Sequence, residues 1–301
     1  MKKILVTGAG GFLGNKLVEL LKELEEVQVI PTSRNPNSVN SAWTDITYDH
    51  LDITDASEVS AIFDKYQPDV VINTAAMSGV DACEESKAEC WKVNTEALQG
   101  LSTKANQFGA HLIHLSSDFV FDGENGPYSE EDITNPVSHY GYSKLSGEKL
   151  ILETANQWTI IRTILVYGIP IVPGRSNFLL WVKDKLQQGQ AIRVVQDQYR
   201  MPTLVDDLAK ACLVAALEQK TGLYHVSGNQ MLSILEMAHK IADFYKLDSS
   251  LISPVFSNQL NQKARRPYKT GFTLDKAIRH LNIPLRSFDD GLKYLEEYPL
   301  A

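Results

Sequence analysis

The stretch VTGAGGFLG near the N-terminus constrains the fold more than any other part of the chain. Its glycines Gly8, Gly11 and Gly14 lie three residues apart, directly after an apolar strand pattern and directly before an amphipathic helix pattern. A turn this tight needs residues without Cβ clashes, and the N–H groups at the start of the helix can then bind a pyrophosphate. The stretch predicts a dinucleotide-binding turn that includes Phe12 and Leu13. The alternative is a tight strand–helix turn that binds no ligand.

Strand and helix patterns alternate through the first half of the chain. The strand patterns are continuous apolar runs, as expected when helices cover both faces of a sheet. This alternation predicts a doubly wound parallel α/β (Rossmann) sheet with right-handed crossovers. The expected strands are 2–7, 27–33, 69–76, 110–117 and 158–168, and the expected helices are 11–25, 57–66, 88–109 and one that starts at Pro136.

A connector that contains proline and glycine, IPIVPGRS, follows Tyr167 and predicts a change of organisation. We expect a dinucleotide-binding domain at residues 1–165 and a smaller α/β substrate-binding lobe at residues 166–301, with some of the later chain returning to the first domain. A chain of 301 residues with 44% hydrophobic content is long enough for two such unequal lobes.

Charge and composition exclude several classes of partner and site. The formal net charge of −8, with no basic block, argues against nucleic acid or an anionic membrane as a partner. No apolar run approaches the roughly 20 residues of a membrane span, so the cytoplasm is the expected location. His111 and His114 would face opposite sides of one strand, and the three cysteines lack metal-type spacing. We therefore expect reduced thiols and no metal site.

The stretch HYGYSK combines two tyrosines with one lysine on an expected helix, which Asn135 would cap with Pro136 in the first turn. Residues four apart share a helix face, so Lys144 should lie beside Tyr140 and not beside Tyr142. An ammonium about 4 Å away would lower the pKa of the Tyr140 phenol from about 10 toward neutrality, where acid–base catalysis is efficient. The alternative is a surface tyrosine beside a solvated lysine.

The end of the second strand favours one form of the dinucleotide. An acidic residue at this position binds the ribose 2′-hydroxyl of NAD, but the strand here ends with Ser33 and Arg34. A guanidinium suits the 2′-phosphate of NADP. We therefore expect NADP(H), with NAD(H) as the alternative for the cofactor and a solvated arginine as the alternative for Arg34.

The order and spacing of the glycine turn, LDITD, NTAA, LSSDFVFDG and YGYSK resemble the extended short-chain dehydrogenase/reductase family over the whole chain. Within that family, VDACEES, HYGYSKLSGEK, VVQDQYRMPT and RRPYKTGFTLDK are most similar to the dTDP-4-dehydrorhamnose reductases. The resemblance implies NADPH-dependent reduction of the C4 ketone of a nucleotide-linked deoxysugar. The resemblance is also compatible with a homodimer.

The resemblance assigns catalytic roles by position. Tyr140 matches the catalytic tyrosine, Lys144 the lysine that also holds the nicotinamide ribose, and Ser117 a residue that hydrogen-bonds the substrate carbonyl. Ser117 also ends a late strand, at the edge where open parallel sheets bind ligands, and a hydroxyl there can donate to a carbonyl and accept from Tyr140. Asn94 matches a helix asparagine that supports the catalytic group. The structural alternatives are a turn serine for Ser117 and a helix-surface asparagine for Asn94.

Further matches concern the cofactor and the substrate. Asp52 and Ile53 match residues near the adenine, with a capping aspartate as the alternative for Asp52. Ala75 and Ala76 match residues beside the ribose, and the alternative is that they are core alanines. Three residues match substrate-facing stretches: Asp118, Asn177 and Arg200. Arg200 could bind the diphosphate of the substrate. A salt bridge between the two lobes is an alternative of equal weight.

The chain departs from the rhamnose-pathway pattern in two places. Relatives carry a tryptophan in the RTSWVYG stretch, where this chain reads RTILVYG with Ile164 and Leu165. Losing an aromatic wall changes which sugar fits. Some relatives bind a divalent metal through acids that include one on the first helix, where this chain has Lys16, so the resemblance implies no metal here.

Two other functions compete with the reductase. GLYHVSGNQMLSILEMAHKIADFYKLDSS and RTILVYG resemble the regulatory β subunit of methionine adenosyltransferase, which binds NADP and serves a partner enzyme. The intact Ser117, Tyr140 and Lys144 favour catalysis. A sugar-nucleotide epimerase or dehydratase with tightly held NAD is the third reading, and Arg34 weighs against it.

Overall fold

The computed structural model describes residues 1–35, 43, 46, 48–172 and 176–297. Its centre is a seven-stranded sheet of order β11-β6-β5-β4-β1-β2-β3, in which all neighbouring strands are parallel. The strands are β1 (Lys2–Thr7), β2 (Val27–Ser33), β3 (Asp49–His50), β4 (Val70–Asn73), β5 (His111–Ser117), β6 (Trp158–Thr163) and β11 (Gly222–Val226). The predicted doubly wound parallel α/β fold is confirmed.

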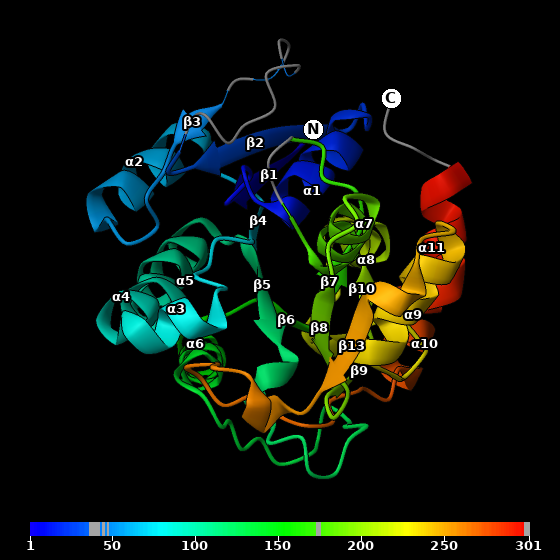
Figure 1. The fold of residues 1–301 in the computed structure, drawn as a ribbon. Helices are drawn as coiled ribbons and strands as arrows, with labels where there is room; N and C mark the ends of the chain where they lie inside the picture. Colours follow the sequence, from blue (N-terminus) through cyan, green and yellow to red (C-terminus); the bar gives the residue numbers. More distant parts are fainter. Residues whose placement is uncertain (36–42, 44–45, 47, 173–175, 298–301) are drawn as a thin grey trace.

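Helices cover both faces of this sheet (Figure 1). Helix α1 packs against α8 on one face, and α2, α5 and α6 pack in series on the other. The strands present apolar side chains to both layers, which explains their continuous apolar sequences. The helices are α1 (Phe12–Lys22), α2 (Ala56–Tyr66), α3 (Val80–Glu85), α4 (Lys87–Trp91), α5 (Ala97–Phe108), α6 (His139–Thr154) and α8 (Val205–Leu217).

The predicted continuous strand over 158–168 is wrong. Strand β6 ends at Thr163, Leu165 has a φ of +36°, and β7 (Val166–Tyr167) then pairs with β10 (Thr203–Leu204) in a separate sheet. The backbone N–H of Thr203 and its hydroxyl both donate to the carbonyl oxygen of Ile164, at 3.1 and 2.6 Å. These bonds hold the chain away from the central sheet, although its apolar sequence continues.

The helix that carries Tyr140 begins later than predicted. Ser138 is its N-cap, with Oγ accepting from the backbone N–H of Gly141 at 3.2 Å, and α6 begins at His139. The predicted cap, Asn135, instead donates from Nδ2 to Asp122 at 3.1 Å. The placement of Tyr140 and Lys144 on one helix is confirmed, because both lie inside α6.

The chain after Tyr167 builds a second layer and also returns to the central sheet. The second layer has its own buried apolar cluster, formed by α7 (Phe178–Gln187), α9 (Ile234–Phe244), α11 (Phe288–Glu297) and the parallel pair β8 (Ile192–Val195) and β13 (Ile252–Val255). Strand β9 (Tyr199–Arg200) pairs with β12 (Leu232–Ser233), and α10 (Asp275–Leu281) packs on β11. The division into residues 1–165 and 166–301 stays a prediction.

Within the described ranges, none of the helices combines the length and the apolar character needed to cross a bilayer.

Candidate functional site

The glycine turn joins β1 to α1 with a backbone that side chains would block. Gly8 has a φ of +66°, and a Cβ there would lie 2.7 Å from the backbone nitrogen of Ala75. A Cβ on Gly14 would lie 2.3 Å from the carbonyl oxygen of Gly8. Gly11 is the N-cap of α1 and provides no side chain to cap it. This turn fits a pyrophosphate, because α1 presents its first N–H groups without a competing side chain. The predicted cofactor residues that begin α1 are Phe12 and Leu13.

Arg34 directly follows Ser33, the last residue of β2. Its side chain is 63% exposed, and its guanidinium lies 3.8 Å from the Asp52 carboxylate and 3.7 Å from that of Glu89. Burial opposes ionisation of Asp52, but hydrogen bonds from Thr54 and the charge of Arg34 hold its pKa below the ordinary value. Asp52 is not a helix cap, because Asp55 caps α2. Arg34 and Asp52 thus lie together at the edge predicted to hold the adenosine ribose; Ile53, next to Asp52, is buried.

The carboxyl end of β5 presents Ser117 and Asp118, both buried. The Ser117 hydroxyl donates to Asp118 Oδ1 at 3.0 Å and accepts from the backbone N–H of Phe119 at 3.3 Å. The Ser117 side chain also acts on the Tyr140 phenol by lowering its pKa, which places the end of β5 near α6. The Phe119 ring meets Tyr140 edge to face, with 5.5 Å between centroids. The structure therefore brings the two predicted catalytic hydroxyls together.

The predicted effect of Lys144 on the pKa of Tyr140 is wrong. The pKa of Tyr140 is raised, first by burial and then by Asp118 and two cysteines, while Ser117 acts in the opposite direction. The Lys144 side chain does not offset these effects because its polar contacts lie on β5: Nζ donates to the carbonyl oxygen of Leu115 at 2.6 Å and lies 3.1 Å from His114 Nε2.

Asn94 is buried rather than on a helix surface. It lies in the π-helical segment Lys92–Glu96 that joins α4 to α5. Its Oδ1 accepts from the backbone N–H of Met77 at 2.9 Å, and its Nδ2 donates to the Met77 carbonyl and the Ser143 hydroxyl, each at 3.0 Å. Asn94 thus ties the chain after β4 to α6. Ala75 and Ala76 lie in that same segment, between Asn73 and Met77.

The structure gives two predicted substrate residues structural partners. Asn177 is the N-cap of α7, accepting from Leu180 N–H at 3.3 Å and donating to the Gly168 carbonyl at 2.8 Å. Arg200 has a side chain only 4% exposed and lies 3.6 Å from Asp118, so it forms the salt bridge left open as its second role. The contact of Arg200 with a diphosphate stays a prediction.

Sequence reasoning missed two residues beside Lys144. Asn73 ends β4 and His114 lies on β5, and both are 1% exposed. Their side chains meet at 3.1 Å between Asn73 Nδ2 and His114 Nδ1. The signal was present, because each is a polar residue inside an apolar strand sequence.

No group of three His, Cys, Asp or Glu side chains suited to a metal ion occurs among the described residues. Lys16, which stands where some relatives carry a metal-binding acid, forms an ion pair with Asp206 at 2.6 Å.

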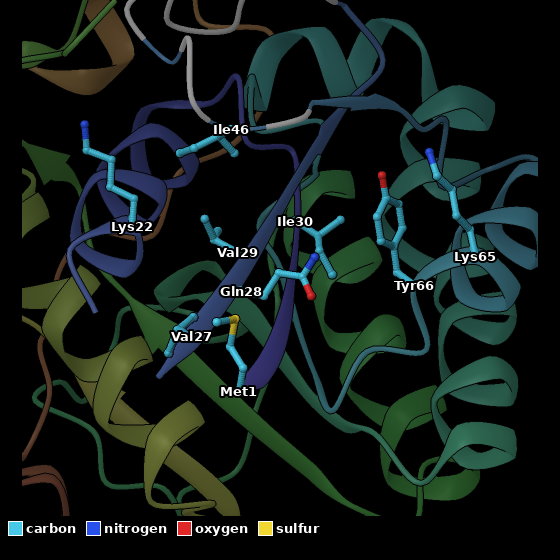
Figure 2. A pocket seen from close by; sticks show the side chains of 9 residues that line it. All are labelled: Met1, Lys22, Val27, Gln28, Val29, Ile30, Ile46, Lys65 and Tyr66. Carbon is cyan, nitrogen blue, oxygen red and sulfur yellow. The ribbon is translucent and has the colours of Figure 1, made fainter. Parts of the chain in front are cut away.

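A cavity of about 520 Å³ lies along the N-terminal half of β2, away from the predicted catalytic residues (Figure 2). Val27, Ile30, Lys65 and Tyr66 are among its lining residues, and none of the predicted catalytic side chains reaches it. We assign it no role in the chemistry.

Comparison with known proteins gives matches over most of the chain. A model of the family described as the RmlD substrate binding domain matches residues 1–298. The spore coat polysaccharide biosynthesis protein SpsK of Bacillus subtilis is 34% identical over 299 residues, 99% of this chain and 98% of SpsK. Methionine adenosyltransferase 2 subunit beta of Bos taurus is 32% identical over 262 residues, 84% of this chain and 75% of that protein. The crystal structure of dTDP-4-dehydrorhamnose reductase from Bacillus anthracis in complex with NADP has a TM-score of 0.84 and 29% identity, with 99% of each chain covered.

Proposed function

The chain belongs to the family of the RmlD substrate binding domain, and from this premise we propose that it is an NADPH-dependent reductase of the dTDP-4-dehydrorhamnose reductase kind. Its substrate would be a nucleotide-linked deoxysugar with a ketone at C4. A solved relative that aligns with 99% of this chain is such a reductase in complex with NADP, which supports both the reaction and the cofactor.

One observation supports this function above the others. The Ser117 hydroxyl at the end of β5 lies near the Tyr140 phenol on α6: Ser117 lowers the pKa of that phenol, and the ring of Phe119, two residues on, lies 5.5 Å from the Tyr140 ring. Ligands of open parallel sheets bind at the carboxyl ends of the strands, and the glycine turn between β1 and α1 lies at this same edge. A ketone placed against the two hydroxyls would be held near the predicted dinucleotide.

The proposed mechanism uses three side chains. When bound, NADPH supplies a hydride to the ketone carbon. Ser117 donates a hydrogen bond to the ketone oxygen as negative charge grows there, and Tyr140 gives its proton to that oxygen. Lys144 would hold the nicotinamide ribose and return a proton to Tyr140. Asn94 keeps α6 in place through Ser143.

The sugar pocket should differ from that of the rhamnose-pathway pattern. Ile164 is fully buried, and Leu165 turns the chain out of the central sheet. Neither of these two residues can form an aromatic wall, and we propose that a 4-keto sugar with a different substitution pattern competes with dTDP-4-dehydrorhamnose.

A direct assay tests the proposal. Purified protein with NADPH is offered a panel of dTDP-, UDP- and GDP-linked 4-keto sugars while NADPH absorbance is followed. We expect ketosugar-dependent oxidation of NADPH, fastest with a dTDP sugar. NADPH that binds without being oxidised by any of the ketosugars would contradict a reductase.

A second candidate function is an NADP-binding regulatory subunit. The 32% identity to methionine adenosyltransferase 2 subunit beta over 84% of this chain favours it. Sedimentation of the chain with a purified methionine adenosyltransferase catalytic subunit tests this function. A stable complex together with an inactive ketosugar panel would favour the regulator. Sedimentation of the chain alone tests whether it forms a homodimer.

A further inference from the structure

A line of buried polar side chains leads away from Lys144 toward the glycine turn. Lys144 Nζ lies 3.1 Å from His114 Nε2, and His114 Nδ1 lies 3.1 Å from Asn73 Nδ2. Asn73 Oδ1 accepts from the Thr7 hydroxyl at 2.5 Å. Each of these four residues is at most 2% exposed. Every proton in the line therefore needs a protein partner.

The orientation of the Asn73 amide is fixed by a backbone donor. The N–H of Ala75 points at Asn73 Oδ1 at 3.3 Å, and a backbone N–H can only donate. Oδ1 is therefore the acceptor, and the amide presents its NH₂ to His114. His114 Nδ1 must then accept this hydrogen bond. A neutral imidazole carries one proton, so that proton is on Nε2.

The Nε2–H of His114 consequently faces Lys144 Nζ. An uncharged amine has a lone pair and can accept this hydrogen bond, whereas an ammonium has three donors and no acceptor. The carbonyl oxygen of Leu115, 2.6 Å from Nζ, accepts a proton from either form. We propose that Asn73 and His114 are positioning residues for Lys144: the Asn73 amide holds His114 as its Nε2–H tautomer, and this ring favours the amine form of Lys144 over the ammonium.

The charges around Lys144 agree with this arrangement. Burial lowers the pKa of Lys144 to about 8, although Glu148 on α6, Cys90 on α4 and Cys83 on α3 oppose the shift. Burial, followed by the charge of Lys144, lowers the pKa of His114 well below its ordinary value, so the ring stays neutral. Lys144 is thus held near the point where it exchanges protons at working pH.

If the proposed function holds, the balance between amine and ammonium at Lys144 sets how Tyr140 regains its proton. After Tyr140 gives its proton to the ketone oxygen, an N–H bond of the Lys144 ammonium breaks and the phenol O–H forms again. His114 then donates to the amine that remains, until Lys144 takes a proton from water. Lys144 acts as a proton carrier rather than as a permanent charge, and His114 keeps its own proton throughout.

Nitrogen NMR of the ligand-free protein tests the tautomer without any turnover. With ¹⁵N-labelled histidine at pH 9, above the pKa of about 8 to which burial lowers Lys144, we expect His114 to show a protonated Nε2 and an unprotonated Nδ1. A protonated Nδ1, or a fully protonated ring, would overturn the inference even if the protein reduces ketosugars. The expected tautomer in a protein that fails to reduce them would leave the inference standing and remove the proposed function.

Variants provide a second readout. The Asn73→Asp carboxylate would accept from Nδ1–H, make Nε2 an acceptor and stabilise the ammonium. His114→Gln offers an amide oxygen to the ammonium and serves if the buried aspartate prevents folding. In either variant, the pH at which turnover falls on the alkaline side (the alkaline limb) should rise by about one unit or more, because the proton-donating ammonium of Lys144 persists to higher pH. The matched control is His111→Phe, a buried histidine on the same strand that bonds Thr159 instead, and its limb should not move. An unmoved limb in a folded Asn73→Asp or His114→Gln protein would overturn the inference.

Discussion

Asp118 and Arg200 form a buried ion pair, with 3.6 Å between Oδ2 and Nε, that joins the end of β5 to β9. The other guanidinium nitrogens donate to backbone carbonyls, including that of Pro267 at 2.8 Å. Asp118 also accepts from Ser117, so the pair links the second layer of the chain to a predicted catalytic hydroxyl. Burial raises the pKa of Asp118, and the charge of Arg200 acts against that rise.

Removing the cation of this pair should destabilise the protein strongly. Arg200→Met leaves the Asp118 carboxylate buried without its partner, and we expect the free energy of unfolding to fall by about 3–5 kcal/mol. Urea denaturation measures this. The control is Lys293→Met, which breaks an exposed pair with Asp290 and should change stability by less than about 0.5 kcal/mol. An equally small effect for both variants would contradict the structural role of Arg200.

The same pair shows a limit of sequence reasoning. The sequence left two roles open for Arg200, because nothing local in MPT or QYR says which carboxylate lies opposite it. The partner, Asp118, is 82 positions away in sequence and is brought near only by the packing of the two layers. A residue whose role depends on a distant partner is the kind that local patterns assign least well.

A methyl group on Gly14 should damage the cofactor turn. Because a Cβ there would lie 2.3 Å from the Gly8 carbonyl oxygen, Gly14→Ala must move backbone, and we expect it to cost roughly 1–3 kcal/mol of stability and most NADPH affinity. Thermal unfolding and fluorescence titration with NADPH measure the two effects. The control is Gly100→Ala inside α5, where no atom beyond the neighbouring helix backbone lies within 4 Å of the new Cβ, and stability should rise by roughly 0.4–1 kcal/mol. If Gly14→Ala behaves like this control, the turn is not close-packed.

Arg34 should separate the two forms of the dinucleotide. Arg34→Ala removes a charge-assisted contact to a 2′-phosphate, worth about 1.5–3 kcal/mol, so the Kd for NADPH should rise roughly 10- to 100-fold. The Kd for NADH should stay nearly unchanged, because NADH has no such phosphate. Titration of both cofactors measures this, with the exposed Arg279→Ala on α10 as the control. Equal effects on NADPH and NADH would remove the basis for an NADP preference.

A buried histidine should make stability depend on pH. His225 Nε2 faces the Arg162 guanidinium at 3.2 Å, and burial, followed by this charge, lowers its pKa to about 3. The unfolded chain takes up this proton near pH 6.5, so the stabilisation is complete above that pH and is lost as the pH falls toward 3. His225→Gln should reduce the loss by about 1.4 kcal/mol per pH unit between pH 6 and 4. Urea denaturation across this range measures the difference, and parallel curves for both proteins would contradict a neutral buried ring.

Local patterns predicted the fold well where sequence and packing agree. Strands β1 and β2 begin and end at the predicted residues, because their apolar runs are bounded by the glycine turn and by polar residues. The local patterns failed at Ile164. The apolar run continues there, but the Thr203 hydroxyl donates to the Ile164 carbonyl and the chain leaves the central sheet. They also missed β11, because its partner strand β6 is distant in sequence.

For the candidate site too, local patterns predicted some features and missed others. Tyr140 and Lys144 share α6 as helical spacing predicted, but the partners of Lys144 lie on β5 and could not be read from its own helix. Buried polar residues inside strands, such as Asn73 and His114, were the unused signal.

The central claim is that Tyr140 donates the proton that completes ketone reduction. The most direct measurement compares kcat for ketosugar-dependent NADPH oxidation, and the Kd for NADPH, between the unaltered protein and Tyr140→Phe. The control, Tyr142→Phe, changes a tyrosine two residues along α6 that is 52% exposed, and it should leave both values unchanged. We predict that Tyr140→Phe lowers kcat by about 10²–10⁴ and leaves the Kd for NADPH nearly the same. A Tyr140→Phe protein with full kcat would contradict the account.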